Sequence, residues 1–148
     1  MSKRDIVKDG DPLLRKVCRE VTAFDGKLAK ILDDMLETLK AANGVGLAAP
    51  QIGLMRRFAI CIINEQELLE IVNPVILEQS GEAVMTEGCL SCPDKWKEVK
   101  RPERIKLKYF DRYGVEHIRD LEGFNARVCC HEIDHLDGIL FYDKAVEK

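Results

Sequence analysis

The sequence predicts an α+β domain, in which antiparallel β-sheets pack around a C-terminal helix carrying an HExxH motif and an amphipathic helix lies near the N-terminus. Three patterns support this prediction: helical apolar spacing early in the chain, short apolar runs broken by turn residues, and a second helical pattern at the end. The order helix, several strands, helix is typical of α+β domains. Since 148 residues can bury a core of their own, we expect one domain over residues 1–148.

The first predicted helix has one apolar face. Its apolar residues recur at intervals of three and four positions: Leu28, Ile31, Leu32, Met35, Leu36 and Leu39. Asp25 is the expected N-cap and Gly44 the expected stop, because short acceptor side chains favour helix starts and glycine favours helix ends. We therefore expect an amphipathic helix whose apolar face packs on the domain.

The central part of the chain predicts strands. Three short β-branched or apolar runs lie between turn residues: 57–63, 70–77 and 82–86. Pro74 favours an edge or a bulge, since proline cannot donate to a β-ladder. Apolar residues alternate with charged ones over 104–110, and a turn over 111–114 leads into another run over 115–121. This last pattern predicts an antiparallel hairpin.

The last predicted helix begins near Glu122, contains His131-Glu-Ile-Asp-His135, and has Gly138 as its expected C′ residue. Positions i and i+4 lie on nearly the same side of a helix, so His131 and His135 could bind one metal ion. Glu132 would then lie near the water of that metal. This pattern favours a hydrolytic metal site.

Catalytic sites of this kind usually have three protein ligands. The extended motif HExxHxxGxxH is excluded because Phe141 occupies its third histidine position, and Glu147 is the only glutamate after the motif helix. We therefore expect the third ligand upstream, among His117, the acidic residues and the four cysteines outside the motif helix. Cys89 stands out because it follows a predicted strand and because its neighbour Gly88 allows close backbone approach.

Charge and composition disfavour several functional classes. The net charge is -3 and basic residues are interspersed with acidic ones, which disfavours direct nucleic-acid binding. No uncharged apolar run approaches the roughly 20 residues of a membrane span, and the N-terminus has no apolar signal region. We therefore expect a cytoplasmic protein without a membrane segment, whose six cysteines are thiols or metal ligands rather than disulfides.

Three motifs in order make the chain resemble the peptide deformylases: GVGLAAPQ at 44–51, EGCLS at 87–91 and HEIDH at 131–135. The likeness includes DPLLR at 11–15 and covers nearly the whole chain. It implies a metal-dependent hydrolase that removes the N-formyl group from the initiator methionine of newly made polypeptides and releases formate. The implied partners are N-formylmethionyl nascent peptides, met at the ribosome exit.

The resemblance also implies the roles of individual residues. Cys89, His131 and His135 would bind one divalent metal, typically Fe²⁺, for which Zn²⁺, Ni²⁺ or Co²⁺ can substitute. Glu132 would act as general base and return its proton to the leaving amine. The Gln51 side-chain amide and the Leu90 backbone N–H would stabilise the oxyanion.

Other residues are expected to bind the peptide or to support the metal ligands. The expected substrate-binding residues are Gly44, Val45, Gly46, Gly88, Phe124 and Val128. The two glycines at 44 and 46 would let an extended peptide add along the backbone by main-chain hydrogen bonds. Glu87 and Arg101 are expected to form an ion pair that supports the EGCLS segment.

The chain departs from the usual family pattern at two cysteines. Cys130 stands where glutamine is common and Cys92 where an aliphatic residue is common. Neither would be a ligand or an acid–base group, so the chemistry should survive. The extra thiols could make the site prone to oxidation.

Other classes of function remain open from the residues alone. Cys89 and Cys92 form a CxxC that, with Cys129, Cys130 and His131, could hold a structural zinc in a non-catalytic binding module. A redox CxxC is weaker, because no βαβ pattern surrounds it. A general metallopeptidase would share the catalytic parts but would cleave unformylated peptides.

Overall fold

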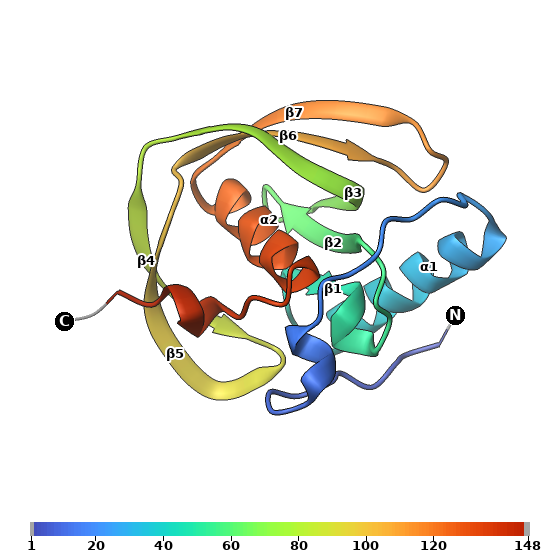
Figure 1. Cartoon of the computed structure of the whole chain (residues 1–148), viewed down its shortest axis with the longest axis horizontal. Helices are drawn as coiled ribbons and strands as arrows, with labels where there is room; N and C mark the ends of the chain where they lie inside the picture. The colour runs from blue at the N-terminus through green and yellow to red at the C-terminus, as the bar shows by residue number, and fades with distance from the viewer. Residues whose placement is uncertain (1, 147–148) are drawn as a thin grey trace.

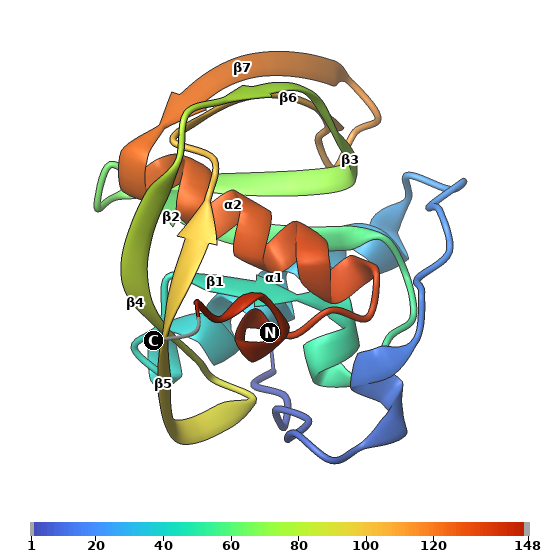
Figure 2. The same cartoon turned by 60° about the vertical axis from the view of Figure 1, so that its left-hand side comes forward.

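The computed structural model describes residues 2–146, which form two antiparallel sheets and two α-helices (Figures 1 and 2). The helices are α1 (Gly26–Ala41) and α2 (Gly123–Leu136), with short 3-10 turns η1 (Pro12–Arg15), η2 (Ala49–Ile52) and η3 (Phe141–Lys144). The strands are β1 (Gly46–Ala48), β2 (Phe58–Ile63), β3 (Glu67–Ser80), β4 (Ala83–Cys89), β5 (Cys92–Arg101), β6 (Arg104–Phe110) and β7 (Glu116–Glu122). No helix among the described residues is long and apolar enough to cross a membrane.

All strand pairs within the two sheets are antiparallel. Five strands form one sheet in the order β1-β2-β3-β6-β7, and β4 pairs with β5 in a separate two-stranded ribbon. Figure 1 shows α2 surrounded by the curved sheet on one side and the ribbon on the other. The predicted α+β class, with antiparallel sheets around the C-terminal helix, is confirmed.

Strand β2 is apolar on both faces because a helix covers each of them. Ala59, Cys61 and Ile63 belong to the core cluster that includes the buried face of α2. The alternate residues Phe58 and Ile60 belong to the cluster formed with α1. Successive side chains of a strand point to opposite faces, so this strand lies between the two helices and has a continuous apolar sequence.

Helix α1 buries Leu28, Leu32, Met35 and Leu39, and the Asp25 side chain accepts a hydrogen bond from the Leu28 backbone N–H at 3.1 Å. The expected stop at Gly44 is wrong, because Asn43 takes the left-handed conformation with φ 56°. The backbone N–H groups of Asn43 and Gly44 donate to the carbonyls of Lys40 and Leu39. This is a Schellman ending, in which asparagine can replace glycine at C′.

The strands differ from the sequence prediction in extent and number. Strand β3 is longer than expected and has a register shift between Val72 and Val75, so Pro74 lies at a bulge, with Asn73 at φ 49°. Strands β1 and β5 were not predicted. Strand β5 is rich in charged residues and mostly exposed, so it lacks the apolar alternation that identifies a strand.

Helix α2 has the predicted ending. Gly138 adopts φ +73°, and a Cβ atom there would lie 2.5 Å from the Arg15 carbonyl oxygen. Both the backbone angle and the close approach of η1 therefore require glycine. This ending fixes the last turn of α2, which carries His135.

Candidate metal centre

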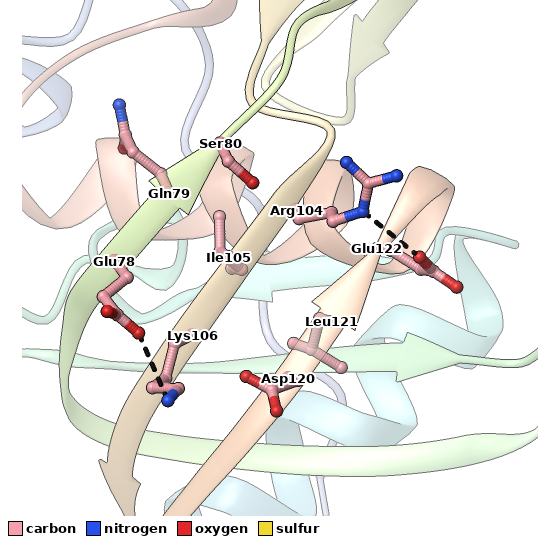
Figure 3. Close-up of a pocket in the computed structure, with 9 residues that line it drawn as sticks. All are labelled: Glu78, Gln79, Ser80, Arg104, Ile105, Lys106, Asp120, Leu121 and Glu122. Carbon is pink, nitrogen blue, oxygen red and sulfur yellow. Dashed lines mark ion pairs between the residues drawn. The ribbon is translucent and has the colours of Figure 1, made fainter.

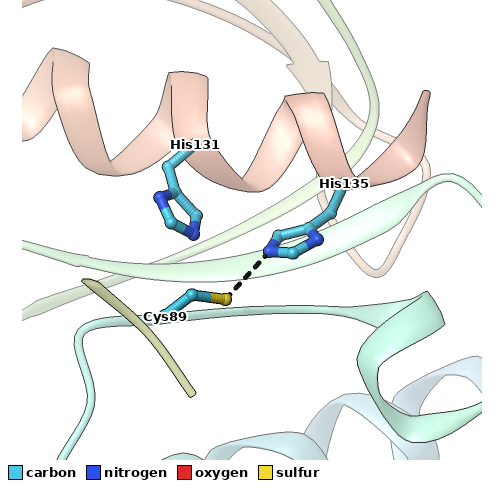
Figure 4. A group of neighbouring side chains, drawn as sticks. All are labelled: Cys89, His131 and His135. Atoms are coloured by element: carbon cyan, nitrogen blue, oxygen red, sulfur yellow. Dashed lines mark hydrogen bonds between the residues drawn. The ribbon is translucent and has the colours of Figure 1, made fainter. Parts of the chain in front are cut away.

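Three potential ligands meet where the end of β4 faces α2. One ligand atom from each of Cys89, His131 and His135 lies within 4.8 Å of the others, and Cys89 Sγ is 3.3 Å from His135 Nε2 (Figure 4). The two histidines extend from successive turns of α2 toward the thiol. Within residues 2–146 no other group of three such side chains is close enough to hold an ion.

Glu87 orients His131. The Glu87 Oε1 atom lies 2.9 Å from His131 Nδ1, which leaves Nε2 free to face the cluster. Arg101 donates two hydrogen bonds to the same carboxylate, at 2.7 and 2.9 Å. Burial opposes ionisation of Glu87, but the hydrogen bonds with His131 and Arg101 prevail and lower its pKa to about 2. A permanent carboxylate behind a histidine is a common way to fix the orientation of a metal ligand.

Arg127 completes this arrangement and was missed from the sequence. Its buried guanidinium donates to Glu87, to the Val99 carbonyl at 3.0 Å and to the Ala83 carbonyl at 2.8 Å. It thereby ties β4 and β5 to α2. Its position four residues before His131, on the face of the predicted helix that carries the motif, was the available signal.

Glu132 lies beside the cluster and is buried, with 4% of its surface exposed. Burial raises its pKa to about 7. Its Oε1 atom has no hydrogen-bond partner among the described residues, and a Cβ atom on Gly46 would lie 2.4 Å from Oε2. The carboxylate is therefore held against β1 with one oxygen free to accept a proton.

The donor set fits a divalent transition metal. Burial lowers the pKa of His135 and keeps its imidazole neutral, as a metal ligand must be. A thiolate with two imidazoles suits iron or zinc, and the unpartnered Glu132 oxygen is available to a nearby water.

Gln51 is fixed by its own hydrogen bonds. Its Oε1 atom accepts from the Ala48 N–H at 2.9 Å, and its Nε2 atom donates to Ser91 Oγ at 3.0 Å and faces Cys89 Sγ at 3.6 Å. The side-chain amide therefore has a set orientation, with its N–H groups toward the tip of the β4–β5 ribbon. Leu90 lies at that tip, next to Cys89.

A cavity of about 470 Å³ adjoins the cluster and is lined by all six expected substrate-binding residues: Gly44, Val45, Gly46, Gly88, Phe124 and Val128. Gln51, Cys89, Leu90 and Glu132 also line it, whereas Arg101 does not. Trp96 was not predicted to line it. A Cβ atom on Gly88 would lie 2.4 Å from the Trp96 ring, so the indole covers this glycine. A single tryptophan on an unpredicted strand gave no sequence signal.

A second hollow, of about 560 Å³, lies between β3, β6 and β7 (Figure 3). Four of its charged side chains form two ion pairs, with Lys106 3.2 Å from Glu78 and Arg104 3.7 Å from Glu122. It holds no cluster of potential metal ligands among the described residues. The chemistry of the molecule therefore centres on the smaller cavity.

The remaining candidate ligands lie elsewhere. His117 on β7 contacts Asp111 at 2.8 Å and stacks on Tyr109. Cys129 is fully buried in the same core cluster as Cys61 of β2, and Cys130 does not line the cavity. The cysteine-rich zinc site considered above is therefore not formed among the described residues.

Comparison with known proteins agrees with this geometry. The sequence pattern of a family described as polypeptide deformylase matches residues 3–148. The chain belongs to the polypeptide deformylase family. It is a metal-dependent hydrolase that removes the N-formyl group from nascent polypeptides, as the three motifs implied.

Similar deformylases are known from several bacteria. The chain is 49% identical to peptide deformylase of Caldicellulosiruptor bescii, over 99% of this chain and 87% of that protein. It is 47% identical to peptide deformylase 1 of Clostridium acetobutylicum, over 99% and 97% of the two chains. The crystal structure of peptide deformylase from Thermotoga maritima superposes with a TM-score of 0.97 at 41% identity, covering 99% of this chain and all of that one.

Proposed function

We propose that Cys89, His131 and His135 hold the catalytic divalent metal of this deformylase, natively Fe²⁺, with Zn²⁺, Ni²⁺ or Co²⁺ as substitutes. The observation that carries this proposal is the meeting of their three ligand atoms within 4.8 Å beside the buried Glu132. A thiolate and two imidazoles suit both iron and zinc. The bound metal supplies Lewis acidity for hydrolysis of the formyl amide.

Glu132 moves the protons in the proposed reaction. Its carboxylate takes a proton from the attacking water and later delivers it to the leaving amine. The free Oε1 atom supports this role, because no other described group competes for it. The close contact with the backbone at Gly46 holds the carboxylate in one position.

Gln51 and Leu90 stabilise the charge that develops on the formyl oxygen. The Gln51 amide is already oriented by its hydrogen bonds with the Ala48 N–H and Ser91 Oγ, which leaves the N–H that faces Cys89 to donate to the oxyanion. The backbone N–H of Leu90 is the second donor in this proposal. Preorganised donors of this kind contribute most in a site shielded from water.

The peptide binds along β1 in this proposal. Strand β1 is at the edge of the five-stranded sheet, so an extended peptide can add beside Gly44, Val45 and Gly46 by main-chain hydrogen bonds. Phe124 and Val128, one turn apart on α2, give the methionine side chain an apolar wall, and Gly88 lines the same cavity. If the side of the site that receives the acyl group has room only for formyl, ordinary peptides would be excluded from cleavage.

The activity is tested by formate release. The protein is purified without oxygen, its metal is quantified, and it is given formyl-methionyl, acetyl-methionyl and unmodified methionyl peptides. We expect about one divalent metal per chain, with iron predominant, and formate from the first peptide alone. Cleavage of the unmodified peptide between amino acids would instead support a general metallopeptidase.

The variant Cys89→Ala tests the ligand set. We expect it to lose metal binding and formate release together, because only two protein ligands remain. Cys18→Ala, which removes a buried thiol outside the cavity, should retain both. Full metal occupancy in Cys89→Ala would overturn the assignment.

We also propose that residues 1–148 form one catalytic domain that works in the cytoplasm and meets its substrates at the ribosome exit. The substrate supports this, since formylated nascent chains emerge there. The net charge of -3 disfavours direct nucleic-acid binding through a basic face. Cosedimentation with translating and with empty ribosomes tests the encounter, and the absence of any preference for translating ribosomes would contradict it. Binding to free ribosomal RNA would contradict the expected lack of direct nucleic-acid binding.

A further inference from the structure

Two thiols lie side by side at the tip of the β4–β5 ribbon. Cys89 and Cys92 are directly opposed in the antiparallel ladder, with Leu90 and Ser91 as the connecting residues. Opposed residues of such a ladder have their side chains on one face and their Cα atoms about 4.5–5.5 Å apart. Disulfides join Cα atoms about 4.4–6.8 Å apart, so this pair fits a disulfide with little backbone movement.

The two side chains belong to one packed group. Cys89 packs against the buried cluster of Cys92, Val99 and Phe141. Both side chains also line the same cavity. The opposed register and the shared packing therefore place the two thiols where local side-chain rotation can join them.

Only this pair can be reached from the cavity. Of the six cysteines in the chain, Cys89 and Cys92 alone line the cavity that receives the peptide. The others are buried and do not line it: Cys18, Cys61, Cys129 and Cys130. A small oxidant that enters by the substrate opening therefore meets Cys89 with Cys92 as its nearest thiol.

We propose that Cys89 and Cys92 form a reversible disulfide when a small peroxide enters the cavity, which removes one metal ligand and switches the enzyme off. This inference rests on the proposed role of Cys89 as a ligand. The inference goes beyond that role in assigning a function to Cys92, whose thiol reacts with the oxidised Cys89 and so resolves it as a disulfide. A sulfenic acid with no neighbouring thiol is oxidised further to irreversible acids, whereas a disulfide is restored by thiol reductants.

The reaction is balanced with hydrogen peroxide as oxidant. The Cys89 sulfur attacks a peroxide oxygen, the O–O bond breaks, and Cys89 becomes a sulfenic acid as one water leaves. The Cys92 sulfur then attacks the Cys89 sulfur, the S–S bond forms, and the S–O bond breaks as a second water leaves. Two thiols lose two electrons in total, and one peroxide is reduced to two waters.

The disulfide removes the ligand because its sulfur is no longer a thiolate. Only His131 and His135 would remain, and two imidazoles hold a divalent metal less firmly than the complete set. Metal release should therefore accompany the loss of the two thiols.

The test uses the zinc-loaded enzyme, to avoid iron chemistry, and treats it with limiting hydrogen peroxide. Intact mass after alkylation of free thiols, and metal release to a chromogenic chelator, are followed together. We expect wild type to lose two alkylatable thiols, gain no oxygen and release its metal in proportion. A thiol reductant with added zinc should restore most of the formate release, and peptide mapping should place the bond between Cys89 and Cys92.

Matched variants separate the proposed role of Cys92 from a general sensitivity of the enzyme to peroxide. In Cys92→Val and Cys92→Ser, Cys89 should instead gain oxygen atoms, and reductant should not restore the enzyme. Cys130→Ser, which removes a thiol next to His131 but outside the cavity, should behave as wild type. The proposal is overturned if wild type forms no Cys89–Cys92 bond, or if wild type and both Cys92 variants give the same products. These mass readouts are independent of deformylation, so they can fail without affecting the proposed function.

Discussion

At the scale of single residues, Glu132 depends on the absence of a side chain at Gly46. A Cβ atom at Gly46 would lie 2.4 Å from Glu132 Oε2, so Gly46→Ala must displace the carboxylate. Misplacement of a catalytic group by about 1 Å can cost on the order of 100-fold in rate. We expect kcat for formate release to fall about 10- to 100-fold with metal content unchanged.

Gly26 provides the control for this variant. A Cβ atom on Gly26 meets nothing within 4 Å, and the residue begins helix α1. Gly26→Ala should leave both kcat and metal content as in wild type. Equal rates for Gly46→Ala and wild type would show that the position of Glu132 does not limit the reaction.

Gln51 is expected to act on the transition state rather than on the metal. Gln51→Leu keeps the size of the side chain but removes its N–H donors, and loss of one preorganised donor costs about 10²- to 10³-fold in kcat. The exposed Gln66→Leu, in the turn between β2 and β3, is the control and should have no effect. Steady-state kinetics with a formyl-methionyl peptide compare kcat for Gln51→Leu and Gln66→Leu. Loss of metal from Gln51→Leu would contradict a role in the transition state alone.

At the scale of elements, two arginines join the β4–β5 ribbon to α2 and so bring Cys89 to the histidines. Arg101 pairs with Glu87 of β4 and with Asp134 of α2, and 3% of its surface is exposed. Removing one partner of a buried ion pair costs about 3–5 kcal/mol, because a buried charge is left uncompensated. Arg101→Ala should therefore lower both the stability and the metal affinity, the latter by about 10- to 100-fold.

Arg104→Ala is the matched control for Arg101→Ala. Arg104 also pairs with a glutamate, but both partners are largely exposed, so the pair contributes little. Thermal unfolding and metal titration of the two variants test the prediction. If Arg101→Ala retained wild-type metal affinity and turnover, Arg101 and Glu87 would have no supporting role.

The elements also show how far the sequence could predict this site. The HExxH spacing predicted that His131 and His135 share one face, because that contact is local to a helix. Cys89 stood out from the other cysteines by its place after a predicted strand and beside Gly88, but its role as a ligand came from the resemblance, since its approach to α2 depends on contacts between distant segments. Only one strand of the ribbon that carries Cys89 was predicted, β4. Strand β5 was not, because it is mostly exposed and has no apolar alternation.

At the scale of the whole molecule, the metal should add stability without being required for folding. The two core clusters around α1 and α2 contain none of the three proposed ligands. A ligand present at about 100 times its dissociation constant adds about 2.7 kcal/mol. Chelation should therefore lower the unfolding temperature by about 5–10 °C while the chain stays folded.

Circular dichroism and thermal scans of the metal-free and zinc-reloaded protein test this expectation. The unfolding temperature should return to its starting value when zinc is added back. Complete unfolding on chelation would indicate a structural metal, as in small zinc-dependent domains.

The central claim is that Glu132 moves the protons of deformylation beside a metal held by Cys89, His131 and His135. The most direct measurement compares wild type with Glu132→Gln, purified without oxygen, for metal content and for formate release from a formyl-methionyl peptide. We predict full metal occupancy and a loss of kcat of about 10²- to 10⁴-fold in the variant. Normal turnover in the metal-loaded variant would contradict the account.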